Sequence, residues 1–143
     1  MEVTSESRKQ LEELGVLLGD MKNYLYKVEQ GCQELSVMFH TADRSQSLET
    51  LTQIMEGLDY YQKLLKSAAV LLKIDFSEIL CEKMSILSLF DHLGQIFTSI
   101  VEATDNEDYS LLTDIIEYDL MPAICISQEM LAIVQGRYEE RVM

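Results

Sequence analysis

The chain has 143 residues, enough for one domain with a sizeable core. Apolar residues make up 48% of it, which excludes a disordered chain, and a single Pro with six Gly indicates long elements and few turns. The polar, acidic N-terminus does not resemble a secretory signal, and no run approaches the roughly 18 apolar residues of a membrane span. These features predict a soluble, cytoplasmic protein.

The net charge is −14, and the charged residues are distributed unevenly along the chain. Residues 1–72 carry seven basic and eleven acidic side chains, whereas residues 73–143 carry four and fourteen. Between Met84 and Gly136 there are nine Asp or Glu and no Lys or Arg. Such a surface repels phosphate groups, so nucleic acid and anionic membranes are excluded as partners.

In the first half, apolar residues recur at alternating spacings of three and four, which is typical of one face of an amphipathic helix. The first row predicts a helix over about 5–41; it comprises Leu11, Leu14, Leu18, Met21, Leu25, Val28, Cys32, Leu35 and Phe39. The polar stretch 41–47 predicts a turn. The second row predicts a helix over about 47–73; it comprises Leu48, Leu51, Met55, Leu58, Gln62, Leu65, Ala69 and Leu72.

In the second half, Asp75 and Glu78 have the spacing of a capping box, which predicts a third helix from there to about residue 103. Its apolar face is expected to comprise Ile79, Ile86, Phe90, Leu93, Phe97 and Ile100. The acidic stretch 104–108 predicts the next connection. A fourth helix follows to about Gly136, with a kink or break between Tyr118 and Pro122 because proline lacks an amide donor and clashes one turn back.

These elements predict one all-α domain over residues 1–143, an up-down-up-down four-helix bundle of hairpins at about 5–73 and 75–136. A shift of 61 residues lays the segment 51–56 on the segment 112–117 and aligns further apolar positions. We interpret this as internal duplication of an αα-hairpin. Heptad patterning alone would also align apolar residues by chance, so both explanations stay open.

Residues capable of chemistry are sparse. Cys32, Cys81 and Cys125 form no CxxC pair, which favours reduced thiols over a disulfide or metal role. Neither His40 nor His92 follows a Glu at the spacing of a di-iron bundle, and both are expected at the surface or its boundary. Nucleophile elbows, phosphate loops and dinucleotide fingerprints are absent. The sequence therefore predicts no enzyme, no cofactor and no metal site.

One candidate interaction surface stands out at the start of the fourth helix. It comprises Asp108, Tyr109, Asp114, Glu117 and Tyr118. Helical spacing puts Asp114 and Glu117 on one face with Tyr118 beside them. Acidic residues around tyrosines suit a basic or amphipathic helical partner, and the alternative is a solvated face that only keeps the protein soluble.

The same segment, residues 108–122, reads D-Y-x-L-L-x-D-x-x-E-Y-x-L-x-P. It resembles a block found in small acidic, all-helical bacterial proteins of no assigned function. The resemblance implies a bacterial origin and membership of an uncharacterised family. It transfers no catalytic residue to this chain.

Three functions follow as hypotheses. The first is a protein-binding adaptor or export-type chaperone with an apolar groove rimmed by Asp114 and Glu117. The second is a structural homo-oligomer, such as a homodimer, because the first helix is about ten residues longer than the second and part of its apolar face lacks a partner. The third is a carboxylate-based metal-binding protein.

Overall fold

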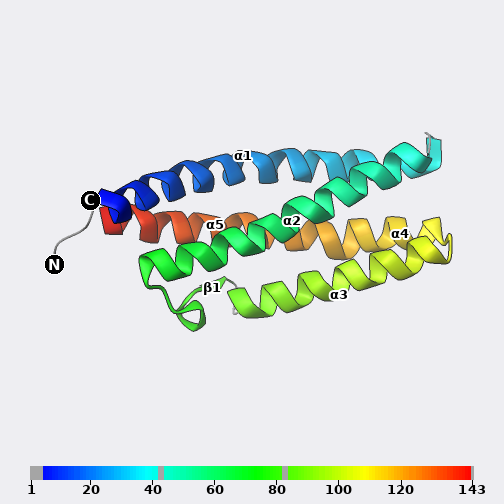
Figure 1. The fold of residues 1–143 in the computed structure, drawn as a ribbon. Coiled ribbons are helices and arrows are strands. Elements are labelled where there is room, and N and C mark those ends of the chain that lie inside the picture. Colours follow the sequence, from blue (N-terminus) through cyan, green and yellow to red (C-terminus); the bar gives the residue numbers. More distant parts are fainter. Residues whose placement is uncertain (1–4, 42–43, 82–83, 143) are drawn as a thin grey trace.

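The computed structural model describes residues 5–41, 44–81 and 84–142, and the protein is all-α apart from one small hairpin (Figure 1). Helices α1 (Ser5–Thr41), α2 (Arg44–Leu72) and α3 (Ile86–Asp105) precede a final helical segment. That segment comprises α4 (Tyr109–Ile115), the π-helical η2 (Ile116–Leu120) and α5 (Met121–Val142). The helices lie side by side along one long direction. Helix α1 packs most closely on α2 and α5, and α3 packs on α4 and α5.

Helix α1 confirms its prediction in both bounds and face. Every residue of its apolar row from Leu14 to Phe39 is buried, and Leu11 at the start of the row is half-buried. The row covers a single stripe of the helix, so the spacing alone identifies the face that turns inward.

The segment after α2 differs from the prediction. Asp75 does not begin an α-helix: its carboxylate accepts hydrogen bonds from the amide and hydroxyl of Ser77 and caps a single 3₁₀ turn, Phe76–Glu78. Ile79 then adopts an extended backbone and its side chain is buried. The carboxylate thus bonds two residues ahead, as in an Asx turn, and this local bond competes with the predicted capping box.

A short antiparallel hairpin follows, formed by β1 (Leu80–Cys81) and β2 (Met84–Ser85), with Leu80 opposite Ser85. Helix α3 starts only at Ile86, where the Ser85 hydroxyl accepts a hydrogen bond from the Ser88 amide. The predicted start of the third helix is therefore about ten residues too early. Its predicted end near residue 103 agrees with the observed Asp105 to within two residues.

The predicted disturbance before Pro122 takes the form of a widened turn. In η2 the amide of Met121 donates to the carbonyl of Ile116, five residues back, and the helix then continues. A π turn accommodates the proline ring and its missing donor without ending the helix. The helix also runs past Gly136 to Val142.

This longer α5 corrects the expectation that part of α1 lacks a partner. Tyr138 of α5 lies so close to Gly15 of α1 that a Cβ at residue 15 would clash with the tyrosine hydroxyl group. The surplus length of α1 is therefore covered within the monomer. Its first turns pack on the end of α5.

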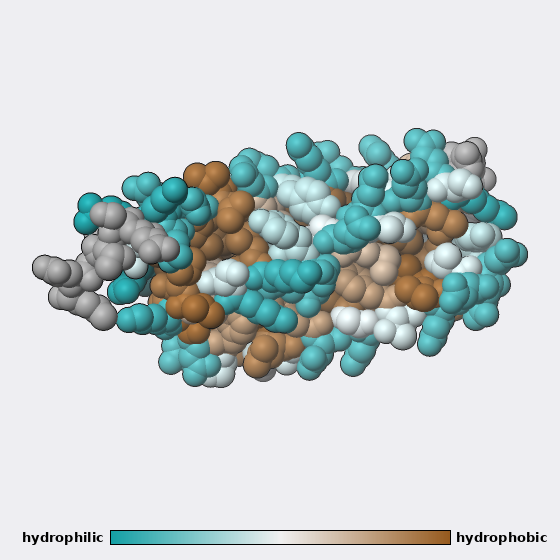
Figure 2. All heavy atoms as spheres, viewed as in Figure 1, coloured by the Kyte–Doolittle hydropathy of each residue, from teal (hydrophilic) through white to brown (hydrophobic). Residues whose placement is uncertain are grey.

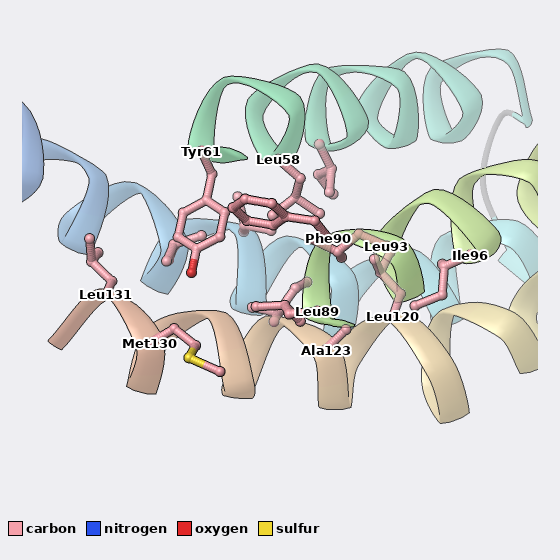
Figure 3. Close-up of a cluster of buried hydrophobic side chains, with 14 of the residues drawn as sticks. Leu58, Tyr61, Leu89, Phe90, Leu93, Ile96, Leu120, Ala123, Met130 and Leu131 are labelled. Carbon is pink, nitrogen blue, oxygen red and sulfur yellow. The ribbon is translucent and has the colours of Figure 1, made fainter. Parts of the chain in front are cut away.

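The core between α2, α3 and α5 contains one fully buried tyrosine. Tyr61 has no exposed surface, and its hydroxyl donates a 2.8 Å hydrogen bond to the backbone carbonyl of Ser127 in α5. Figure 3 shows the ring reaching from α2 toward α5 beside Met130. Burial raises its pKa above the ordinary tyrosine value, which keeps the phenol protonated.

Internal duplication stays a prediction. Two aligned pairs, Val28 with Leu89 and Leu35 with Ile96, consist of buried residues in both halves. In contrast, Ser47 is buried inside α2, whereas its counterpart Asp108 is an exposed helix cap. Ala42, which aligns with Ala103, lies outside the described residues.

Candidate partner-binding groove

The buried row of helix α2 shares Leu51, Leu58, Leu65 and Leu72 with the predicted row and differs from it by one residue at the positions between them. The buried row runs 47, 51, 54, 58, 61, 65, 68 and 72, with spacings of four and three throughout. Met55 of the predicted row is only half-buried, and so is Leu48. The prediction is therefore confirmed at every second position and one residue off at the others. We call the half-buried residues Leu48, Met55, Gln62 and Ala69 the α2 flanking row.

Helix α3 repeats this arrangement. Its buried row comprises Ile86, Leu89, Leu93, Ile96, Ile100 and Ala103, with Phe90 buried beside it. Phe97, which was predicted to face the core, is half-buried, and Val101 is 49% exposed. Flanking positions of helical bundles commonly carry charged residues, so apolar side chains there leave a surface that the monomer does not fully cover.

Leu48 and Met55 of the α2 flanking row and Phe97 and Val101 of α3 line a groove of about 640 Å³ between the two helices. Its apolar lining comprises Leu48, Leu51, Met55, Phe97, Ile100 and Val101. Figure 2 shows apolar residues gathered between these helices, with hydrophilic side chains along the margins. We call this feature the α2–α3 groove.

The margins of the α2–α3 groove are acidic. Glu56 and Asp59 line it from α2 and Asp105 from α3, and no lining residue is Lys or Arg. Lys63 forms a 3.0 Å ion pair with Asp59, but both side chains are more than half exposed, so this pair neutralises little of the local field. The groove therefore combines an apolar floor with a negative potential.

Four of the five residues predicted as the interaction surface are exposed. Asp108 is exposed and caps α4, its carboxylate accepting a 3.1 Å hydrogen bond from the Leu111 amide. Asp114, Glu117 and Tyr118 are exposed on α4 and η2, and Tyr118 is 73% exposed. None of them lines the α2–α3 groove, and a role for Asp114 and Glu117 in binding a partner stays a prediction.

Tyr109, the fifth predicted residue, packs inside the fold. It is half-buried, its ring lies 6.1 Å from that of Phe39, and the Arg44 guanidinium sits 4.3 Å from its centroid. These contacts join the start of α4 to the end of α1 and the start of α2. Tyr109 therefore stabilises this end of the protein and does not belong to an exposed patch.

Of the three cysteines, Cys32 and Cys81 are buried and Cys125 is exposed. Burial raises the pKa of Cys32 to about 12, and the Glu29 carboxylate adds to the rise. Partial burial, with Glu29 and Glu129, also raises the pKa of Cys125. Both thiols are therefore protonated at neutral pH, which leaves them weak nucleophiles.

Residues 5–41, 44–81 and 84–142 contain no group of three or more His, Cys, Asp or Glu placed to hold a metal ion. His92 is half-buried on α3, while the side chain of His40 lies outside the described part. None of the helices, over the same ranges, is long and apolar enough to cross a membrane.

A family model described as a domain of unknown function (DUF8042) matches residues 16–130. The chain belongs to the DUF8042 family. The DUF8042 match begins within α1, ends within α5 and includes both walls of the α2–α3 groove. No curated protein and no solved structure matches the chain.

A signal for this groove was present in the sequence. Within α2 of this DUF8042 chain, Ile54 next to Met55 and Tyr61 next to Gln62 offer two candidate rows, and in α3 Ile96 precedes Phe97. A double row means that the apolar stripe is wider than one helix contact requires. The predicted rows took one residue of each adjacent pair, Met55 in α2 and Phe97 in α3, and so did not reveal the extra width.

Proposed function

We propose that this DUF8042 protein is a non-enzymatic, cytoplasmic protein-interaction module of bacterial origin, an adaptor or an export-type chaperone. Its scaffold is an up-down-up-down four-helix bundle. The α2–α3 groove holds an amphipathic helix with basic flanks from a partner protein. The observation that supports this proposal is the apolar floor of the groove combined with its acidic margins.

The dimensions of the groove suit a short helix. Its α2 wall extends from Leu48 to Asp59, which corresponds to about 17 Å of helix at 1.5 Å per residue. A partner helix of about three turns would cover this length. Its apolar residues at positions i, i+3, i+4 and i+7 would contact Met55, Phe97 and Val101, as in other helix-in-groove complexes.

The charges of the groove select the partner. Basic residues flanking the apolar face of the partner would approach Glu56, Asp59 and Asp105 from both margins. Such rim charges mainly accelerate association and exclude acidic competitors, and salt screens them. The absence of Lys and Arg over residues 84–136 extends this preference beyond the groove itself.

The test uses a synthetic amphipathic peptide of about three turns, with Leu on one face, Lys on its flanks and one Trp. Because the chain contains no Trp, fluorescence of the peptide reports binding without background. We expect saturable binding that weakens as salt rises. A peptide of the same composition in scrambled order serves as the control for simple charge attraction, and equal binding of both peptides would contradict the proposal.

Two variants test whether the peptide binds in the α2–α3 groove. Val101→Glu puts a charge on the floor of the groove at a half-exposed position, and we expect it to weaken peptide binding at least about tenfold, which corresponds to about 1.4 kcal/mol. Val16→Glu on α1, 64% exposed and not among the residues that line the groove, is the matched control. If both variants bind the peptide equally well, the groove is not the site.

A further inference from the structure

The outer face of α2 carries a regular row of exposed residues opposite its buried row. We call it the outer stripe; it comprises Glu49, Thr52, Glu56, Asp59, Lys63, Lys66 and Val70. Its spacings of three and four continue over three heptads, so the side chains follow one line along the helix. Every member is exposed, and Val70 is 77% exposed.

The acidic and the basic residues of the outer stripe lie in separate halves of the helix. Between residues 45 and 74 every acidic residue precedes Tyr60, and every basic residue follows it. The acidic half contains Glu49, Glu56 and Asp59, and the basic half contains Lys63 and Lys66, with Lys73 just beyond the helix. A helix whose only purpose is solubility would more commonly mix the signs, placing Glu and Lys three or four residues apart along its length.

The acidic and basic halves of the outer stripe are complementary when two copies of α2 lie antiparallel. Around residue 61, Glu56 and Lys66 are equidistant, and so are Asp59 and Lys63, and Glu49 and Lys73. A second α2 lying antiparallel across the first would therefore meet opposite charge along its whole length. A parallel arrangement would place like charges together, which is destabilising.

We propose that a second copy of this chain binds here, with the two outer stripes antiparallel around a two-fold axis near Tyr61. Such an isologous contact uses the same surface on both copies. Tyr60, 47% exposed, and Val70 add apolar area beside the charges. Both also line a hollow of about 440 Å³ between α1 and α2, together with Leu14, Leu17, Leu64 and Leu71.

The existing ion pair within α2 does not prevent this contact. Asp59 and Lys63 are bonded to each other at 3.0 Å, with side chains 58% and 72% exposed. An exposed pair of this type contributes little to stability, so its exchange for partners on a second copy costs little. This inference does not rest on the proposed function, although Glu56 and Asp59 also line the α2–α3 groove and a second copy would compete there with a helical partner.

The test is the solution mass by sedimentation velocity at about 10 μM and about 100 μM chain, a range that reveals weak interfaces. We expect the average mass to rise with concentration toward twice that of the chain. The rise should be smaller in about 0.5 M salt than in about 0.05 M salt because the pairs are exposed. A monomer at both concentrations in low salt would overturn the inference.

Charge variants identify the surface. Lys63→Glu with Lys66→Glu makes every charged residue of the outer stripe acidic, and Glu56→Lys with Asp59→Lys makes every charged residue of it basic except Glu49. Each double variant alone should be monomeric, and an equal mixture of the two should form the dimer again. Circular dichroism checks that both keep the wild-type helix content.

The control is Lys22→Glu with Lys27→Glu, which makes the same change at exposed positions of α1. It should self-associate as the wild type does. If the control is impaired as strongly as the α2 variants, the effect is one of net charge and the inference is wrong. It is also wrong if the mixture of α2 variants stays monomeric.

Discussion

Tyr61 offers a direct measure of how α2 is joined to α5. In Tyr61→Phe the ring keeps its volume and only the hydroxyl is removed, together with its 2.8 Å hydrogen bond to the Ser127 carbonyl. That carbonyl lies inside α5 and still accepts the helical amide four residues later, so no buried acceptor is left unsatisfied. The expected loss is therefore that of one buried neutral hydrogen bond, about 1 kcal/mol.

Urea unfolding followed by circular dichroism measures this difference, and a thermal scan should show a fall in Tm of about 2–4 °C for a chain of this size. The control is Tyr60→Phe, which removes the same hydroxyl from the neighbouring exposed ring and should change stability by less than about 0.5 kcal/mol. If Tyr61→Phe is as stable as the wild type, or if Tyr60→Phe costs as much, the buried contact does not contribute as we describe.

Two further predictions concern helix ends. Glu107, with φ of 53°, holds the left-handed position after α3, so Glu107→Gly should raise the free energy of unfolding by about 0.5–1 kcal/mol. Glu102→Gly inside α3 should lower it by about 1 kcal/mol, and equal effects in urea unfolding would refute the cap assignment. Backbone and side-chain hydrogen bonds from Ser77 lower the pKa of Asp75, so its contribution is present above the ordinary aspartate range and lost as pH falls through the folded value. The stability difference between wild type and Asp75→Ala should therefore shrink on acidification below about pH 4, and a difference independent of pH would contradict this.

Local patterns predicted α1 correctly because its apolar row is a single stripe. Between Leu14 and Phe39 no adjacent apolar residue competes consistently with the row, so one face alone can turn inward. The acidic connection before α4 was also predicted, since Asp108 caps the helix through its own side chain. Such contacts depend on residues a few positions apart.

Where the outcome depended on residues far away, the predictions were wrong. Ile54 and Met55 suit a core equally well, and the packing of α5 and α1 on α2 decides that Ile54 is buried. The same applies to Ile96 and Phe97 in α3. The Asp75 capping box failed because Ile79 and Cys81 are buried as an extended segment and not as a helical turn.

By itself, the sequence determined the helical class, the inward face of α1, the absence of basic residues over 84–136 and the opposite charges in the two halves of the outer stripe. These properties follow from spacing and residue type within single segments. The tertiary structure alone decided which of two adjacent apolar rows is buried in α2 and α3. Because Leu48, Met55 and Phe97 are left only half-buried, they line the α2–α3 groove together with Val101, and the proposed function depends on this surface.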